Sequence, residues 1–485
     1  MSATQHIAFD NSYAALPERF YAKLNPVEAS QPKLIAVNGA LAELLGLDQD
    51  WLRSPDGLGM LAGNKIPVGA DPLAMAYAGQ QFGQWSPQLG DGRALLLGEL
   101  VGKDGIRRDI QLKGSGPTPF SRRGDGRSWI GPVLREYIVS EAMHALRVPT
   151  TRALAAVETG ETVYRESELP GAVFTRVSRG HIRVGTFQYF AIREDVDALR
   201  TLADYAIDRL YPEAKDADNP TLALLDVVIA AQAKLVAHWM SLGFIHGVMN
   251  TDNVSIAGET IDYGPCAFMD AYHPDRVFSS IDEMGRYAYS NQPNIAHWNL
   301  VQFAQAILPL LGETEEEQIA AAQKAIDVFP GLYETKLARR MNAKLGLESV
   351  EDGDKEIVSD LLKIMTEEKA DFTVVFRGLG TDEFRGNFVD LAKIDVWLER
   401  WNSRVKQEQV SSDKIRERIA SASPAFIPRN HRIEHAIKAA LEGDYAPFHR
   451  LNAVLSVPFE EQPNHVEFMD PPESDEIVRY TFCGT

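Results

Sequence analysis

Apolar positions recur along the chain at two spacings, and the helical spacing dominates its second half. Residues 129–147 (WIGPVLREYIVSEAMHALR) carry apolar residues every three to four positions, which predicts an amphipathic helix. Residues 221–244 are apolar on most helical faces, which indicates a buried helix. From about residue 295 to residue 450 the pattern predicts a series of amphipathic helices.

Strand-like patterns are concentrated in the first half. Residues 94–100 and 107–112 flank a glycine-containing turn, and this arrangement predicts a β-hairpin. Residues 171–178 (GAVFTRVS) predict a further strand. The stretch NVSIAGETIDYG (253–264) is expected to form two short strands around Gly258.

Composition and charge narrow the classes of partner. The chain has 485 residues with 45% hydrophobic and 24% charged residues, as expected of a globular protein, and its net charge is −19. Such an acidic chain is a poor partner for nucleic acid or an anionic membrane surface. We see no apolar run near 18 residues and therefore predict no transmembrane helix. The N-terminus lacks the pattern of a signal peptide, so the cytoplasm is the expected location. The sequence does not predict the oligomeric state.

The stretch HGVMNTDN (246–253) has the spacing of the kinase catalytic loop H-G/R-D-x-x-x-x-N. In kinases the aspartate accepts the proton of the attacking hydroxyl, and the asparagine binds a metal ion. Asn253 matches the asparagine, but Val248 stands where the aspartate should be. Valine cannot accept a proton. The loop alone is compatible with an inactive kinase, a chance match, or a kinase-like site used for another reaction.

Three further residues follow the kinase order. Lys113 ends a predicted strand, Glu136 lies in the next predicted helix, and Asp262 opens the triplet DYG. In kinases these positions bind phosphate, orient the lysine and bind metal, respectively. The oxygen ligands of Asn253 and Asp262 suit Mg²⁺ or Mn²⁺ bound to nucleotide phosphates. The agreement in order and element type favours a nucleotide site over a chance match.

The chain lacks the kinase G-x-G-x-x-G loop ahead of Lys113 and has two loops rich in glycine and basic residues instead. They are GDGR (90–93) and SRRGDGRS (121–128), and arginines continue at Arg176, Arg179 and Arg183. Guanidinium groups form forked hydrogen bonds with phosphate oxygens, so the cluster predicts a cage for a triphosphate. The alternative for each arginine is a surface ion pair with one of the many carboxylates.

At these motifs the sequence resembles the selenoprotein O family of protein adenylyltransferases, over nearly the whole chain. The most specific stretches are GQQFGQWSPQLGDGRA, QLKGSGPTPFSRRGDGRS, FTRVSRGHIRVGTF and HGVMNTDNVSIAGETIDYGPCAFMDAY. The resemblance implies an α+β, protein-kinase-like fold with two lobes and helical extensions at both ends. The implied parts are an N-terminal extension (1–75), an N-lobe with nucleotide-binding loops (76–190), a helical C-lobe (191–400) and a C-terminal extension with a tail (401–485).

The resemblance also implies a reaction. ATP would bind inverted relative to kinases, and AMP would pass to Ser, Thr or Tyr hydroxyls of substrate proteins with release of pyrophosphate. Asp252 would be the proton acceptor, and Asn253 and Asp262 would bind Mg²⁺ or Mn²⁺. The implied nucleotide-binding residues are Gly90, Gly92, Arg93, Lys113, Asp125, Gly126, Glu136 (bracing Lys113), Arg176, Arg183 and Asp262. Two alternatives remain: a kinase that transfers the γ-phosphoryl group, and a nucleotide-binding pseudokinase scaffold.

The chain has two cysteines, Cys266 and Cys483. By themselves they are most simply two unrelated thiols, since two cysteines are too few for a disulfide scaffold. Members of the resembled family from eukaryotes carry selenocysteine near the C-terminus, where this chain has Cys483. The resemblance therefore implies a reversible redox disulfide between Cys266 and Cys483.

Overall fold

The computed structural model describes residues 7–482. Its strands are β1 (Tyr21–Lys23), β2 (Lys33–Val37), β3 (Leu73–Met75), β4 (Gly79–Gln81), β5 (Gln84–Ser86), β6 (Ala94–Val101), β7 (Arg107–Lys113), β8 (Ser128–Trp129), β9 (Arg152–Tyr164), β10 (Glu168–Ser178), β11 (Phe244–Ile245) and β12 (Ala267–Phe268). Its α-helices are α1 (Gly39–Leu44), α2 (Gln49–Arg53), α3 (Pro55–Ala62), α4 (Ile130–Ala145), α5 (Val184–Ala191), α6 (Val196–Leu210), α7 (Pro220–Leu242), α8 (Gln292–Ala306), α9 (Glu315–Ile326), α10 (Phe329–Lys344), α11 (Asp354–Glu368), α12 (Phe372–Gly378), α13 (Leu391–Val405), α14 (Ser412–Ala422), α15 (Asn430–Leu441) and α16 (Ala446–Leu455).

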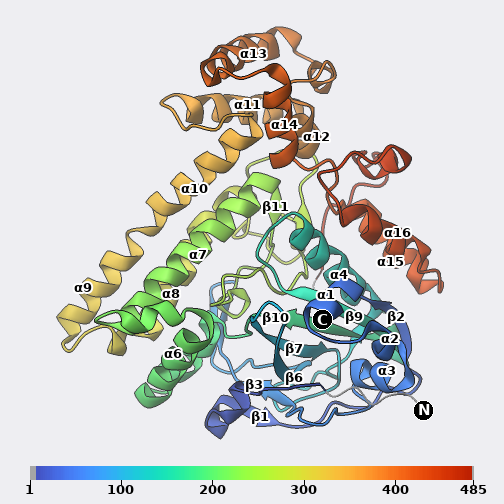
Figure 1. Cartoon of the computed structure of the whole chain (residues 1–485), viewed down its shortest axis with the longest axis vertical. Coiled ribbons are helices and arrows are strands. Elements are labelled where there is room, and N and C mark those ends of the chain that lie inside the picture. Colours follow the sequence, from blue (N-terminus) through green and yellow to red (C-terminus); the bar gives the residue numbers. More distant parts are fainter. Residues whose placement is uncertain (1–6, 483–485) are drawn as a thin grey trace.

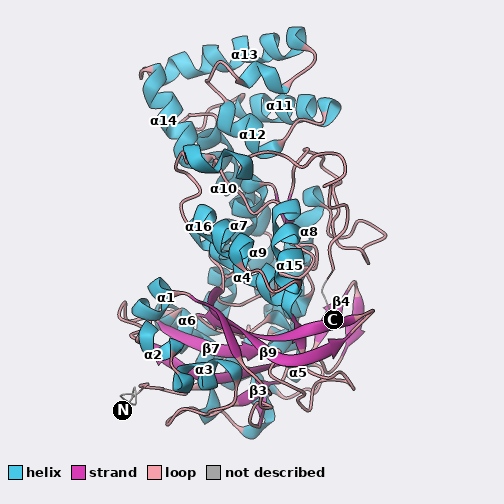
Figure 2. Ribbon diagram, turned by 90° about the vertical axis from the view of Figure 1, so that its right-hand side faces the viewer, coloured by secondary structure: helices cyan, strands magenta, loops and turns pink. Residues whose placement is uncertain are grey.

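One twisted antiparallel sheet forms the lower part of the molecule, and helices make up the rest (Figures 1 and 2). Its strand order is β1-β3-β6-β7-β10-β9-β2, with β8 paired to β10. The predicted hairpin is confirmed as β6 and β7, and the strand predicted at 171–178 lies within β10. The helices predicted at 129–147 and 221–244 are confirmed as α4 and α7. The mixed α and β content with an antiparallel sheet agrees with the expected α+β class.

The two faces of the sheet pack against different helices. Leu97 and Ile110 belong to a core that includes residues of α1–α3, such as Leu61. Leu96 and Phe174 belong to the large core shared with α4 and the helical region. Successive side chains of a strand point to opposite faces, so neighbouring residues of β6 enter different cores. The face toward α4 is the one that carries the candidate site.

Helix α7 runs through the core of the helical region. It begins behind the cap residue Asn219, whose side chain accepts a hydrogen bond from the backbone N–H of Leu222, and it ends at Gly243 in a left-handed conformation. By length and composition α7 would suffice to span a membrane, with a mean hydropathy of 1.6, so the statement that no apolar run approaches 18 residues was wrong. Of its most apolar stretch of 18 residues, 56% is buried inside the protein, as in a core helix.

The two short strands predicted around Gly258 are not formed. Within 253–264 the structure has only isolated bridges, from Ser255 to Arg183 and from Thr260 to Thr150. Each half of the stretch meets a different neighbouring segment, so no ladder develops although Ile256 is buried. The local apolar pattern therefore reflected burial in loops and not strand pairing.

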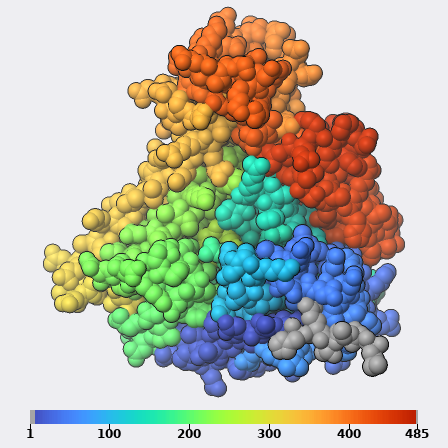
Figure 3. All heavy atoms as spheres, viewed as in Figure 1, coloured from blue at the N-terminus to red at the C-terminus, as the bar shows by residue number. Residues whose placement is uncertain are grey.

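The C-terminal third first leaves the body and then returns to it. Helices α11–α14 form a knob at one end of the long axis, joined to the body through α10 (Figures 1 and 3). Helices α15 and α16 then pack back onto α4. There Nη1 of Arg135 donates a hydrogen bond of 3.3 Å to Oδ1 of Asn430. This contact supports the helix that carries Glu136.

The tail before the last three residues is also attached to the body. Thr481 is 2% exposed, and its hydroxyl donates a hydrogen bond of 2.6 Å to the carbonyl of Pro265. Its backbone N–H donates to the carbonyl of Phe278 at 2.8 Å. The tail thus fixes the segment that follows Asp262.

Candidate functional site

A cleft of about 1000 Å³ lies between the sheet and the helical region. The structure brings every nucleotide, metal and proton-acceptor residue expected from the sequence to this cleft. They are Gly90, Gly92, Arg93, Lys113, Asp125, Gly126, Glu136, Arg176, Arg183, Asp252, Asn253 and Asp262. Arg179 does not line the cleft, and its guanidinium donates to the carbonyl of Leu210 instead.

Strand register places the two central cations. On β7 and β10, Gln111 pairs with Arg176 and Lys113 pairs with Phe174. Residues two apart on a strand share a face, so Lys113 and Arg176 both project toward α4. The guanidinium of Arg176 donates to Oε1 of Gln111 at 3.3 Å, which holds the arginine in line with the lysine.

Glu136 of α4 pairs with both of these cations. Its Oε2 lies 2.6 Å from Nζ of Lys113, and its Oε1 accepts from Nε of Arg176 at 2.9 Å. Burial opposes ionisation of this carboxyl, but Arg176 and Lys113 together hold its pKa below the usual value. The predicted lysine–glutamate pair is therefore present in the structure.

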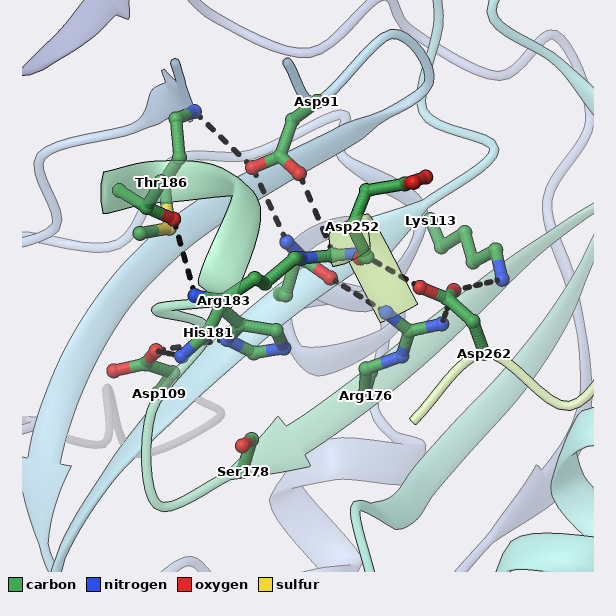
Figure 4. A network of polar contacts seen from close by, with 12 residues as sticks. Asp91, Asp109, Lys113, Arg176, Ser178, His181, Arg183, Thr186, Asp252 and Asp262 are labelled. Carbon is green, nitrogen blue, oxygen red and sulfur yellow. Dashed lines mark hydrogen bonds and ion pairs between the residues drawn. The ribbon is translucent and has the colours of Figure 1, made fainter. Parts of the chain in front are cut away.

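Asp262 is surrounded by three cations (Figure 4). Its Oδ1 accepts from Lys113 at 3.0 Å and from Arg176 at 2.6 Å, and its Oδ2 accepts from Arg183 at 2.8 Å. Burial alone would raise the pKa of Asp262, but Arg176, Lys113 and Arg183 hold it well below the usual range. Asp262 also has a φ of 62°, a left-handed conformation that is uncommon outside glycine and often found at functional sites.

Asp252 has a different environment. It is 7% exposed, and burial raises its pKa to about 6, although Arg183 acts in the opposite direction. Oδ2 accepts a hydrogen bond of 3.1 Å from the side-chain amide of Gln81, whereas Oδ1 is buried without a partner among the described residues. A Cβ at Gly79 would lie 2.6 Å from Oδ1, so only glycine fits beside this carboxylate. Asp252 thus combines a proton affinity near neutrality with an oxygen available to a substrate.

Val248 and Asn253 are joined directly. Nδ2 of Asn253 donates a hydrogen bond of 3.0 Å to the backbone carbonyl of Val248. This bond uses the amide nitrogen and leaves the amide oxygen as the atom that can bind a cation. Asn253 and Asp262 together offer hard oxygen ligands in one cleft. Such a pair fits Mg²⁺ or Mn²⁺, because phosphates and water supply the remaining ligands.

The glycine loops need their glycines for close packing. Gly90 has a φ of 66°, and a Cβ there would lie 2.2 Å from the ring of Phe120. Gly126 has a φ of 65°, and a Cβ would lie 2.1 Å from the backbone of Gly116. Both backbones therefore approach their neighbours more closely than any side chain permits. Both loops are therefore closely packed at the edge of the cleft.

Arg93 and Asp125 occupy this edge in different ways. Arg93 has no ion pair within residues 7–482, and its Nη1 is buried without a hydrogen-bond partner. A guanidinium with a buried nitrogen that lacks a partner is a ready site for an anion. Asp125 instead pairs with Arg165 at 2.7 Å, and this hydrogen bond lowers the pKa of the Asp125 carboxyl.

Three residues of the cleft were missed by sequence reasoning. Arg165 binds Asp125 from the turn between β9 and β10, and the ring of Tyr77 lies 4.7 Å from the guanidinium of Arg183. Asp91 is 2% exposed and pairs with Arg183 at 3.8 Å. Asp91 lies within the GDGR motif, so its position was a usable signal, whereas nothing local marked Tyr77 or Arg165.

The predicted disulfide would join a described cysteine to one that lies outside the described residues. Cys266 is buried, but Cys483 lies outside the described residues. Thr481, two residues before Cys483, is bonded to Pro265, the residue before Cys266. The disulfide stays a prediction.

Comparisons with known proteins agree with the geometry. The family model described as Protein adenylyltransferase SelO matches residues 3–456. Three relatives, each called Protein nucleotidyltransferase YdiU, come from Bradyrhizobium diazoefficiens, Methylorubrum populi and a Ruegeria species, at 56%, 57% and 57% identity. The alignments cover 99%, 98% and 99% of this chain, and 100%, 99% and 100% of the respective relatives. The chain therefore belongs to the SelO family of protein adenylyltransferases and is an enzyme of the nucleotidyltransferase class.

Proposed function

We propose that this enzyme transfers AMP from ATP to the hydroxyl groups of Ser, Thr or Tyr side chains on other proteins. The observation that carries the proposal is the combination, in one cleft, of a buried proton acceptor with a cluster of fixed cations. Asp252 supplies the acceptor, and Arg93, Lys113, Arg176 and Arg183 supply the cations. The family description and the names of the relatives support nucleotidyl transfer to protein.

In this reaction the hydroxyl oxygen of the substrate forms a bond with the α-phosphorus of ATP. The bond from the α-phosphorus to the oxygen bridging it to the β-phosphorus breaks, and pyrophosphate leaves. Asp252 accepts the hydroxyl proton, and its pKa of about 6 suits that role at neutral pH. Negative charge builds up on the leaving pyrophosphate, and fixed cations that need no reorganisation stabilise it.

The cations are held in place by carboxylates of the site. Arg183 donates to Oδ2 of Asp262 and, from the same nitrogen, to the backbone carbonyl of Asp252 at 2.7 Å. This bridge sets the position of the acceptor relative to the phosphate-binding cluster. Glu136 likewise holds Lys113 and Arg176 in position by accepting a hydrogen bond from each of them. The charges are therefore arranged before substrate arrives, which is what preorganised catalysis requires.

A divalent cation, Mg²⁺ or Mn²⁺, would be held by Asn253 and Asp262, and it would neutralise phosphate charge. Asp262 is hydrogen-bonded to three cationic side chains in the described structure. When a divalent cation binds, these side chains must share the carboxylate with it. Arg93 has no carboxylate partner to share, because it forms no ion pair within the described residues. We infer that Arg93 makes the first phosphate contact.

We further propose that the fold is protein-kinase-like and that ATP binds inverted relative to kinases. The order Lys113, Glu136, Asn253, Asp262 on a strand, an α-helix, a short 3-10 helix (Thr251–Asn253) and a loop supports the first point. Val248 supports the second, because its 5% exposed side chain offers no base where a kinase needs one. If this site transferred the γ-phosphoryl group as a kinase does, it would lack a proton acceptor at the position where kinases have one.

The position of the label on ATP tests the proposal. The protein is incubated with the divalent cation, an acceptor protein, and ATP labelled at either the α- or the γ-phosphate. We expect protein-bound label from α-labelled ATP alone. Label from γ-labelled ATP alone would establish a kinase, and binding of ATP without any transfer would indicate a scaffold.

A further inference from the structure

A second hollow lies beside the cleft, across the hairpin β4–β5. It has a volume of about 340 Å³, and we call it the glutamine pocket. Its principal lining residues are Gln80, Gln188, Gln302, Gln305, Trp85 and Ile192. Trp85 lines both the glutamine pocket and the cleft. The two spaces are therefore adjacent, with the indole of Trp85 at their boundary.

The hairpin links the pocket to the proton acceptor. Gln80 pairs with Trp85 across the hairpin, and Gln81 pairs with Gln84. Neighbouring residues of a strand point to opposite faces, so Gln81 reaches Asp252 in the cleft while Gln80 lines the pocket. Strand β4 also packs against α5 and the loop that carries Asp252 (Figure 2 shows β4 at the end of the sheet layer).

A hydrogen bond from the backbone of the hairpin supports this arrangement. The N–H of Gln80 donates to the hydroxyl of Thr251 at 2.7 Å, and Thr251 precedes Asp252. The bond links a wall of the pocket to the residue that precedes the proton-accepting carboxylate. A chain seated in the pocket would present its neighbouring residues to the cleft in one register.

The chemistry of the pocket selects its occupant. No charged side chain is among the described residues that line it. The Oε1 atoms of Gln80 and Gln188 are buried without hydrogen-bond partners in the described chain, and Gln188 is 6% exposed. Unpaired buried acceptors favour a ligand that brings N–H donors, and they disfavour a phosphate. A polypeptide backbone supplies such donors at nearly every residue.

Ile192 and Trp85 add apolar contact to this polar lining. Ile192 is 56% exposed at the edge of the pocket and Trp85 is 39% exposed between the pocket and the cleft. Large exposed apolar side chains of this kind are typical of interaction sites when they gather around a hollow. The pocket thus suits a peptide segment with an uncharged side chain.

We propose that the glutamine pocket receives the segment of the protein substrate next to the modified hydroxyl. The segment binds in extended form, places an uncharged side chain between Trp85 and Ile192, and donates backbone N–H groups to the glutamine amides. This inference rests on the proposed function, because it assigns the acceptor side of the same transfer. It makes the pocket a determinant of substrate specificity.

A charge placed at the edge of the pocket tests the proposal kinetically. In Ile192→Arg the pocket gains a cation that an uncharged segment cannot pair. With α-labelled ATP and unfolded, dephosphorylated β-casein as the acceptor, we expect KM for casein to rise about tenfold or more. KM for ATP should stay within about twofold. The matched control is Ile319→Arg on α9, where the isoleucine is 51% exposed and does not line the pocket.

A cross-linking experiment tests binding without activity. The photoreactive residue p-benzoylphenylalanine replaces Ile192 in one variant and Ile319 in the other. On irradiation with casein and a non-hydrolysable ATP analogue, we expect a casein adduct from position 192 and at most a trace from position 319. Equal adducts, or none from position 192, together with an unchanged KM for casein in Ile192→Arg, would overturn the pocket assignment.

The two experiments separate the pocket from the proposed function. If casein cross-links at position 192 but α-label never reaches protein, the pocket stands and AMP transfer is wrong. If α-label reaches casein normally in Ile192→Arg and no adduct forms, AMP transfer stands and the pocket is wrong.

Discussion

Gln81 donates from its side-chain amide to Oδ2 of Asp252 at 3.1 Å, and this contact joins the hairpin β4–β5 to the proposed base. It orients the carboxylate and leaves Oδ1 without a partner in the described chain. The donor also moderates the effect of burial, which otherwise raises the pKa of Asp252. The hairpin therefore holds the acceptor in position without occupying both of its oxygens.

Asp252→Asn should remove the proton acceptor while keeping the shape of the side chain. We expect turnover of α-label transfer to fall about 10²- to 10⁴-fold, the usual contribution of a general base. ATP affinity should be largely kept, because the cations that bind phosphate are untouched. Transfer rates and ATP titrations measure the two effects, and near-normal turnover would remove Asp252 from the mechanism.

Val248→Asp restores the kinase sequence at the position where this chain departs from it. If ATP binds inverted, the γ-phosphate does not face this position, and the new carboxylate gains no kinase function. We expect no transfer from γ-labelled ATP in the variant. The measurement is the same labelling assay, with the wild type as control. γ-Label on protein would show that ATP also binds in the kinase orientation.

Glu136→Gln should weaken the site by releasing two cations at once. Lys113 and Arg176 lose their shared carboxylate, and Arg176 is 1% exposed. Breaking a buried pair on one side costs about 3–5 kcal/mol of stability. ATP affinity should fall about 10- to 100-fold, the scale of a lost hydrogen bond to a charged group. Denaturant unfolding and ATP titration measure the two losses. A variant with wild-type values for both would show that Glu136 braces neither cation.

The sequence predicted the centre of the site better than its edges. Lys113 and Glu136 were found because their elements have strong local patterns, and their pairing follows from the order of strand and helix. Tyr77 and Arg165 were missed because they reach the cleft only through long-range packing. The prediction of two strands around Gly258 was wrong for the same reason, since a local pattern cannot specify which segment a strand will pair with. The division into four parts and the cytoplasmic location stay predictions, because no structural feature tests them.

The predicted disulfide between Cys266 and Cys483 gives a redox test. Thr481 already bonds to Pro265, so the tail is attached beside the segment after Asp262. A bridge there would close a loop of more than 200 residues and add about 4–5 kcal/mol of stability in the chain-entropy model. By pinning this segment it would restrict the site, so we expect a thiol reductant to raise activity in the wild type and to have no effect in Cys483→Ser. Free thiols on both residues after oxidation, found by non-reducing peptide mapping, would contradict the bridge.

Lys344 makes a prediction about stability and pH. Its side chain is buried at the end of α10, with the amine 4.8 Å from the ring centre of Phe376, and burial lowers its pKa to about 7. Below pH 7 the amine is protonated in both the folded and the unfolded chain, so the folded state carries a buried charge. Between pH 7 and the unfolded pKa near 10.5 only the unfolded chain holds the proton, and the free energy of unfolding therefore rises with pH through this window.

Lys344→Met removes the charge at similar length and should stabilise the protein by about 1–3 kcal/mol near pH 6, with a smaller gain near pH 9. Denaturant unfolding of both proteins at the two pH values measures the difference. The exposed Lys324→Met on the neighbouring helix α9 is the control, and a gain that is equal at both pH values, or absent, would show that Lys344 is not a buried charge in the folded protein.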